Sequence, residues 1–377
     1  MSTSGGQPSA ARAHPLRIIA ITARADVGGG PEHLYRLLAH LGPDVDATVV
    51  APRQEPYWTR LQSLPSVAEM IEIEPRAFRL STLRRLRRAV SAGRFHLIHS
   101  HGKGAGLYGR LLGATTTTPA VHTFHGLHIG EYSRVKQRAY LALEWLLGRT
   151  TATAIAVSEG EAAQLAQRRL VPAARLVTIR NGVDIPVRPA TRTRNTGAPL
   201  QIVTASRFDV QKNFDGALDI FSELSSDRGI DFRATVLGDG PGMAQARDAV
   251  TTRQLGDTVR LMGNVARPRD HYRAADVYLS TSLWEGMPLA LLEAMSEGLP
   301  AVVTDVVGNR EAIQHRGNGF LYPAHDAVAA ATALVEMRDP ALRRSMGRAA
   351  ARSVAEDFGI STMAARTLGV YQDCAHR

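Results

Sequence analysis

The chain has 377 residues, about twice the ~150 residues of a typical domain, so two domains are expected. Hydrophobic residues make up 44% and charged residues 21%, as in an ordinary globular protein, and no apolar run reaches the ~18–20 residues of a membrane-spanning helix. The net charge of +10 comes almost wholly from arginine, which a biased codon supply explains better than nucleic-acid binding does, so nucleic acid is not an expected partner.

The N-terminal half predicts a first α/β domain. Residues 1–15 are polar and without periodicity, and we expect them to form a disordered leader. Short apolar runs then alternate with helical patterns, which is typical of parallel α/β units. The predicted strands of this half are 16–23, 47–51, 70–73, 96–100, 120–124, 154–157 and 176–179. They place the first domain at residues 16–187.

The C-terminal half predicts a second domain of the same class. Residues 190–199 are polar and contain proline, as a linker would, and residues after 339 have a helical pattern. The predicted strands are 200–205, 232–237, 259–261, 277–281, 301–304 and 319–322, which place the second domain at residues 188–354. Ligands of open parallel sheets bind at the carboxyl ends of the strands. If these ends face each other, the cleft between the domains is the expected active site.

A glycine-rich loop, Val27-Gly28-Gly29-Gly30-Pro31, follows the first predicted strand. Glycine allows close approach of the backbone to a ligand, Pro31 suits the first turn of a helix, and the N–H groups of a helix start attract phosphate. The spacing differs from Gly-x-Gly-x-x-Gly, which argues against a nicotinamide cofactor. A tight turn without a ligand is the alternative explanation.

Two charged segments of the first half carry competing interpretations. Asp44-Val45-Asp46 resembles a metal–diphosphate motif, but it precedes its strand and so lies at the wrong end of the sheet; we interpret it as a solvated turn.

Residues 80–90 place apolar side chains at helical spacing and carry Arg84, Arg85, Arg87 and Arg88. This basic amphipathic helix fits either an anionic membrane surface or the solvated outer face of the domain.

Five histidines gather near the ends of two predicted strands: His99, His101, His122, His125 and His128. Imidazole is a common zinc ligand, but no carboxylate or cysteine lies at a matching spacing, so no metal is expected. We expect these side chains at the cleft as hydrogen-bond donors to a sugar or phosphate. His125, which precedes Gly126, is the favoured one.

The second half contributes two cations and two carboxylates. Arg207 and Lys212 follow its first strand, where they can hold a diphosphate. Glu285 and Gly286 follow a later strand, and Pro288 begins a helix that carries Glu293. Two glutamates can accept hydrogen bonds from several hydroxyls of a polyol. Glu293 lies in an apolar helix, where a buried carboxylate would need a partner.

With these motifs the chain resembles glycosyltransferase family 4, a group of retaining enzymes of the GT-B class. The resemblance runs in order over about residues 16–370. Besides the glycine-rich loop and Glu285-x7-Glu293, it rests on the segments 99–102, 123–126, 156–158, 179–184, 237–241, 308–311 and 318–320. It departs from the family pattern at Arg180, where proline is frequent, and in the third glycine of the first loop.

The resemblance implies an α/β fold of two Rossmann-like domains that face each other across a cleft. The first domain would bind the acceptor, the second the nucleotide sugar, and about residues 355–377 would cross back to the first. Arg207 and Lys212 would hold the donor diphosphate, Glu293 the ribose, and Glu285 the sugar hydroxyls. The remaining implied contacts with the donor come from Gly28, Gly29, His101, His125, Gly238, Gly286, Met287, Pro288 and Leu289.

The implied activity is hexosyl transfer with retention, from a UDP- or GDP-sugar to a glycan or polyprenyl-linked acceptor in surface-polysaccharide or lipopolysaccharide synthesis. A double displacement needs a carboxylate nucleophile, and these motifs offer no evident one. We therefore expect front-face attack, without metal or cofactor, in which Arg207, Lys212 and helix-start amides meet the charge of the leaving diphosphate.

Three other functions stay open at this point. A nucleotide-sugar epimerase of GT-B-like architecture would need no acceptor, a nicotinamide dehydrogenase would fit the fold class, and a nucleic-acid binder would fit the charge. The single cysteine, Cys374, excludes a disulfide within the chain and a cysteine-based metal site. With no signal-peptide pattern, a cytoplasmic location is expected, with or without peripheral contact at the inner membrane face.

Overall fold

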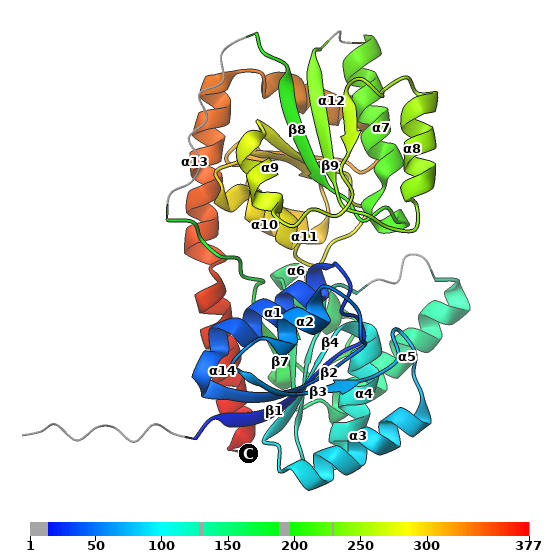
Figure 1. Ribbon diagram of the computed structural model, residues 1–377, viewed down its shortest axis with the longest axis vertical. Coiled ribbons are helices and arrows are strands. Elements are labelled where there is room, and N and C mark those ends of the chain that lie inside the picture. The colour runs from blue at the N-terminus through cyan, green and yellow to red at the C-terminus, as the bar shows by residue number, and fades with distance from the viewer. Residues whose placement is uncertain (1–13, 128–131, 188–196, 228–229, 377) are drawn as a thin grey trace, which may run out of the picture.

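The computed structural model describes residues 14–127, 132–187, 197–227 and 230–376. Most of the expected leader, much of the expected linker and His128 lie outside these ranges. The described chain forms two α/β domains stacked one on the other (Figure 1). This confirms the fold class expected from the sequence.

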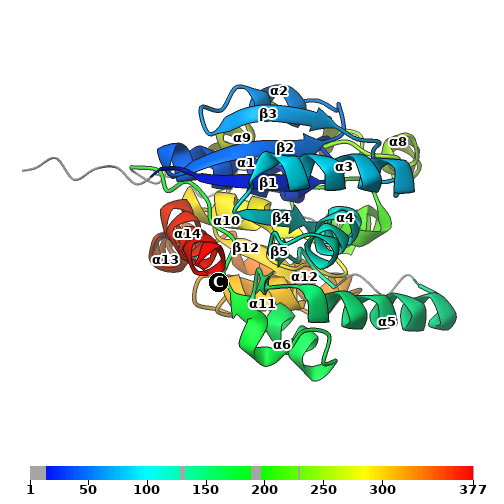
Figure 2. The same ribbon diagram turned by 90° about the horizontal axis from the view of Figure 1, so that it is seen from below.

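The first domain is built on a seven-stranded parallel sheet in the order β3-β2-β1-β4-β5-β6-β7. Figure 2 shows its first five strands side by side. Its strands are β1 (Leu16–Thr22), β2 (Val45–Ala51), β3 (Val67–Glu72), β4 (Leu97–His101), β5 (Ala120–Thr123), β6 (Thr153–Ala156) and β7 (Leu176–Thr178). Its helices are α1 (Gly29–Leu41), α2 (Tyr57–Gln62), α3 (Leu80–Gly93), α4 (Gly102–Thr115), α5 (Arg134–Thr150) and α6 (Glu159–Gln167).

Alternating residues of β1 explain why both faces of this sheet are covered. Ile18 and Ala20 belong to a core with α1 and α2, whereas Ile19 and Ile21 belong to a core with α3 and α4. Side chains alternate between the two faces of a strand, so a continuous apolar run such as this one predicts burial on both.

The second domain has a six-stranded parallel sheet in the order β10-β9-β8-β11-β12-β13. Its strands are β8 (Leu200–Ala205), β9 (Phe232–Leu237), β10 (Val259–Leu261), β11 (Val277–Ser280), β12 (Ala301–Thr304) and β13 (Gly319–Tyr322). Its helices are α7 (Phe214–Ser222), α8 (Met243–Thr252), α9 (Pro268–Ala274), α10 (Leu289–Ser296), α11 (Val307–Ala312), α12 (Ala327–Glu336) and α13 (Pro340–Asp357).

The final helix, α14 (Ile360–Ala375), packs on the first domain, against α1 and β4. Figure 1 shows α13 and α14 following one another along the same side of the two domains. The hydroxyl of Tyr371 lies 2.5 Å from Nδ1 of His99, and Sγ of the buried Cys374 lies 3.4 Å from Oγ1 of Thr153. The last helix therefore completes the core of the first domain.

All the predicted strands are present, and their ends coincide with the predicted ones or differ from them by at most three residues. The earlier start of β2 changes the interpretation of the Asp44-Val45-Asp46 segment. Asp44 ends a short 3-10 turn, but β2 already begins at Val45, so the prediction of a turn is wrong for Asp46. The segment still lies at the amino end of β2, opposite the cleft.

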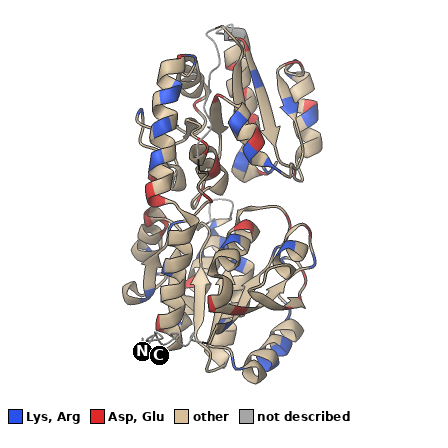
Figure 3. Cartoon of the chain, turned by 60° about the vertical axis from the view of Figure 1, so that its left-hand side comes forward, with Lys and Arg blue, Asp and Glu red and all other residues tan. Residues whose placement is uncertain are grey.

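Helix α3 is the predicted basic helix, and Figure 3 shows its basic residues along the helix. Leu86 and Val90 are buried in the core, whereas Arg84, Arg85, Arg87 and Arg88 are exposed. Leu80 was expected on the inner face, but it is 62% exposed because it stands at the first turn, beyond the edge of the core. Among the described residues, no helix combines the length and apolar character needed to cross a membrane.

Candidate active site

The carboxyl ends of both sheets meet where the two domains touch, and the predicted site residues follow these ends. Gly28 and Gly29 follow β1, His101 ends β4, and His125 comes after β5. From the second domain, the loops after β8, β9 and β11 carry Arg207, Gly238 and Glu285. The topology thus brings residues that are far apart in sequence to one cleft.

The glycine-rich loop leads directly into α1, with Gly28 as the residue before the helix. A Cβ atom at Gly29 would meet nothing within 4 Å, whereas one at Gly28 would lie 3.2 Å from a guanidinium nitrogen of Arg24. Space therefore lies open beside the first turn of α1, where the backbone N–H groups can receive a ligand.

The histidines divide into two groups, which corrects the expectation that all of them line the cleft. His99 and His122 are fully enclosed and bond inside the sheet layer: His99 contacts Thr123 at 2.8 Å, and His122 contacts Ser100 at 3.0 Å. Burial lowers the pKa of His99 to about 3, so it stays neutral. His99 and His122 are core residues.

His101 and His125 do lie at the cleft, and they are joined by His33 of α1, which the sequence did not single out. Nδ1 of His33 lies 3.0 Å from Oδ1 of Asn181, and Nδ2 of Asn181 donates to the carbonyl of Met287 in the second domain at 2.8 Å. Asn181 therefore ties the histidine group to the opposite domain.

Arg207 and Lys212 lie on the loop after β8, as predicted, and each already has an acidic partner. The Arg207 guanidinium bonds the carboxylate of Asp209. Asp209 also accepts a hydrogen bond from the backbone N–H of Lys212 at 3.1 Å, which closes the 3-10 turn Val210–Lys212. Lys212 Nζ donates to Oε1 of Glu285 at 2.5 Å. A diphosphate would have to exchange partners with these carboxylates.

The loop after β11 packs tightly against the first domain. A Cβ atom at Gly286 would lie 2.9 Å from the backbone nitrogen of Gly126, next to His125. Only glycine fits there without displacing backbone. Met287 is buried, Pro288 is the residue before α10, and Leu289 is its first residue. This loop thus brings the residue that follows Glu285 against the backbone of His125 and Gly126.

Glu293 has the partner that its apolar surroundings require: its carboxylate accepts a hydrogen bond from Arg36 of α1. Arg36 also bonds Glu32 at 2.6 Å. Burial raises the pKa of Glu293, although Arg36 acts in the opposite direction. The carboxylate expected at the ribose therefore forms a buried ion pair across the domain interface.

Packing explains why residue 238 is a glycine, which the sequence did not reveal. Its φ is +120°, and a Cβ atom there would lie 2.2 Å from the carbonyl oxygen of Ser206. The loop after β9 thus packs tightly on the loop that carries Arg207. This contact explains the glycine without a ligand.

Pattern reasoning missed Asp209, Asn181, His33 and Arg36. The signal for the last two was weak but present, because they lie three residues apart and so face the same side of a helix. Both are less than a tenth exposed. Polar side chains on one helix face normally indicate solvent, and only contacts with distant residues, Asn181 for His33 and Glu293 for Arg36, show that this face is an interior one.

Two family profiles match in succession and cover most of the chain. Residues 27–186 match Glycosyltransferase Family 4, and residues 192–353 match Glycosyl transferases group 1. D-inositol 3-phosphate glycosyltransferase of Pseudarthrobacter chlorophenolicus is 32% identical over 316 residues, which are 78% of this chain and 74% of that protein.

Two more distant similarities agree with these matches. UDP-Gal:alpha-D-GlcNAc-diphosphoundecaprenol alpha-1,3-galactosyltransferase of Escherichia coli is 24% identical over 307 residues, which are 74% of this chain and 76% of that protein. The crystal structure of Anabaena Alr3699/HepE with UDP and glucose superposes with a TM-score of 0.81, covers 95% of this chain and 99% of that one, and is 18% identical. The latter similarity shows the fold. None of these proteins supports the epimerase alternative.

Proposed function

The chain belongs to glycosyltransferase family 4 with the GT-B fold, and from this premise we propose that it transfers a hexose, with retention, from a UDP- or GDP-sugar. The observation that carries the proposal is the junction at Gly286. There the loop that carries Glu285, whose carboxylate accepts a hydrogen bond from Lys212, lies against the His125–Gly126 backbone of the other domain. A diphosphate at Lys212 would thus place its sugar toward His125.

In the proposed reaction, the diphosphate leaves toward Arg207, Lys212 and the open start of α1, whose positive groups stabilise its growing charge. The acceptor hydroxyl attacks from the same face, and its proton passes to the departing phosphate oxygen. Glu285 holds sugar hydroxyls once the diphosphate has drawn Lys212 away from its carboxylate. Glu293 turns from Arg36 to the ribose, and the loops at Gly238 and Gly286–Leu289 support the donor.

Protein cations take the role of a metal in this proposal, so we expect transfer to be independent of divalent ions. The Asp44–Asp46 segment supports this, because it lies at the end of β2 that faces away from the cleft.

We further propose a lipid-linked acceptor, of the kind used in surface-polysaccharide or lipopolysaccharide synthesis. A cavity of about 220 Å³ lies between α4 and α5 near the cleft, and its lining mixes Lys103 and Arg76 with the aromatic rings of Phe78, Tyr132 and Tyr140. Cations beside aromatic and apolar walls suit a phosphorylated lipid. The named acceptor of the Escherichia coli relative belongs to this class.

Peripheral contact with an anionic membrane fits the same domain. The apolar residues Leu86 and Val90 of α3 are buried and are not available for insertion. Exposed apolar side chains are present instead on α5, where Val135, Trp145 and Leu146 are 78%, 47% and 57% exposed. We expect binding to anionic vesicles that weakens when Arg84, Arg85, Arg87 and Arg88 become serine; unchanged binding would remove this part of the proposal.

The test of the donor proposal is thermal unfolding with UDP, GDP, ADP, CMP or NAD at equal concentration, with EDTA present. A ligand at 100 times its dissociation constant stabilises the native state by about 2.7 kcal/mol, which shifts the melting temperature visibly. We expect a selective shift with one nucleoside diphosphate that is lost in Arg207→Ala. A shift with NAD alone, or with none of the ligands, would contradict the proposal.

A further inference from the structure

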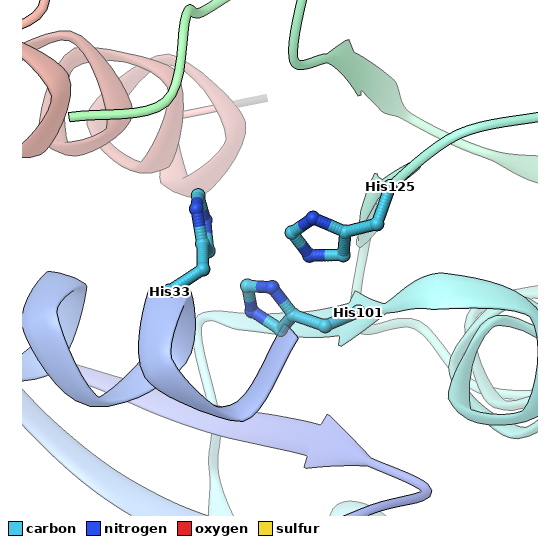
Figure 4. A group of neighbouring side chains, drawn as sticks. All are labelled: His33, His101 and His125. Atoms are coloured by element: carbon cyan, nitrogen blue, oxygen red, sulfur yellow. The ribbon is translucent and has the colours of Figure 1, made fainter. Parts of the chain in front are cut away.

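Three histidine rings of the first domain converge on one point at the cleft (Figure 4). His33 comes from α1, His101 from the end of β4 and His125 from the segment after β5. One ring nitrogen of each lies within 4.8 Å of those of the other two. The ring centroids are 4.8–5.7 Å apart, and Figure 4 shows the rings turned toward one another.

Two of these side chains have features expected of metal ligands. His33 is 4% exposed, and the bond from its Nδ1 to Asn181 fixes the ring so that Nε2 is the nitrogen available to a ligand. A second partner of this kind orients most metal-binding imidazoles. His101 is 5% exposed, and neither of its ring nitrogens has a hydrogen-bond partner among the described residues. A buried polar group without a partner is costly and indicates a missing ligand.

The chemistry of the group suits a transition metal. Burial lowers the pKa of His33 to about 4 and that of His101 well below its usual range, so both are neutral and can donate a lone pair at pH 7. Neutral imidazole suits Zn²⁺, Cu²⁺ and Ni²⁺, whereas Mg²⁺ and Ca²⁺ prefer oxygen. Three protein ligands leave a fourth tetrahedral position for water or a substrate oxygen.

We propose that His33, His101 and His125 form a binding site for one Zn²⁺-like transition-metal ion, with its fourth position toward the cleft. Zn–N bonds of about 2.0–2.1 Å bring three nitrogens to roughly 3.3 Å of one another, so small ring rotations must close the group around the ion.

The site lies beside the Gly286 loop, and it uses His125, toward which the proposed function places the donor sugar. On that basis, the ion would occupy the place of the sugar and would inhibit transfer. Binding of the ion does not depend on this assignment, because it requires only the three histidines.

The experiment is a titration of the metal-free full chain with Co²⁺, followed by displacement with Zn²⁺. Tetrahedral Co²⁺ absorbs strongly in the visible range, which reports the geometry directly. We expect one ion per chain, loss of the tetrahedral bands in His33→Gln and His101→Ala, and affinity reduced roughly 10–100-fold in Asn181→Ala, which removes only the orienting partner. X-ray absorption of the Zn²⁺ form should count three imidazoles.

His325→Ala and His376→Ala are matched controls, because both histidines are exposed and lie outside the cleft. We expect them to bind Co²⁺ like the natural chain. Melting curves of the metal-free variants verify that each is folded. If one of His33→Gln and His101→Ala does not fold, the other still tests the proposal. Tetrahedral bands that persist in both His33→Gln and His101→Ala, or no such bands in the natural chain, would overturn the metal proposal. The donor proposal would still hold in that case if a nucleoside diphosphate raises the melting temperature.

Discussion

The two halves of the cleft differ in how they are charged. The half from the first domain presents His33 and His101, which burial keeps neutral, beside an open helix start. The half from the second domain presents cations that are already paired, Arg207 with Asp209 and Lys212 with Glu285. If the donor binds as proposed, the cations that must exchange partners to hold the diphosphate, Arg207 and Lys212, both belong to the second domain. The following changes test that division.

The largest effect is expected from Arg207→Ala. Loss of one preorganised group that meets the developing charge should lower turnover on the order of 10²–10³-fold. The measurement is the initial rate with the nucleotide sugar whose nucleoside diphosphate stabilises the protein. Arg233→Ala is the control, because Arg233 lies on β9 with a side chain 52% exposed. A loss below tenfold would remove Arg207 from its proposed role.

Glu293→Ala should be the next largest change, seen in stability. It leaves Arg36 buried without its partner from the other domain, and breaking a buried pair costs about 3–5 kcal/mol. Glu32 still pairs with Arg36, so we expect the lower end of that range. Urea unfolding measures it, with Arg36→Met and the double variant completing a mutant cycle. Additive losses would show that the two side chains do not interact.

Gly286→Ala tests the contact between the halves. The added methyl group would lie 2.9 Å from the backbone nitrogen of Gly126, so the two loops must separate. Overpacking of this kind costs about 1–3 kcal/mol. We expect a lower melting temperature and weaker stabilisation by the nucleotide. Gly256→Ala is the matched control, because a Cβ atom there would meet nothing within 4 Å. Equal behaviour of the two variants would contradict close packing at Gly286.

Glu161 gives a smaller effect that depends on pH. Burial, with a further contribution from Glu311, raises the pKa of this carboxyl to about 7. The folded state therefore holds a proton that the unfolded state releases near pH 4.5, and stability falls as pH rises to about 7. Between pH 6 and pH 7 the loss is about 1 kcal/mol. In Glu161→Gln, the free energy of unfolding should depend less on pH over this range, as measured by urea unfolding at each pH. If the curves of the variant and the natural chain run parallel, the pKa of Glu161 is not raised.

The smallest expected effect is that of EDTA on transfer, because in the proposed function Arg207 and Lys212 take the place of a metal. We expect an unchanged rate in the chelator. Activity abolished by EDTA and restored by Mn²⁺ would overturn this expectation and reopen the search for a metal on the donor half.

The strands and the loops of the site could be predicted because their signals are local. Apolar runs as short as Val259–Leu261 were found without the structure, and so was the place of Arg207 after β8. His33 and Arg36 gave only a weak signal, because the residues that they bond, Asn181 and Glu293, lie more than a hundred residues away in the sequence. Likewise, the sequence cannot show that Lys212 and Glu285 pair with each other. Local patterns indicate which residues reach the cleft, and only packing shows which of them meet.

The two segments that connect the domains lie side by side. The N–H of Val183 donates to the carbonyl of Phe358 at 2.9 Å, and the N–H of Ile360 donates to the carbonyl of Val183 at 3.0 Å. The first domain is discontinuous in the sequence, because α14 returns to it after the second domain. A chimera that exchanges the second domain between relatives needs two splice points, one after Val183 and one before Ile360. Truncation at Phe358 would instead expose the core of the first domain, so a C-terminal tag is a safer modification than a C-terminal deletion.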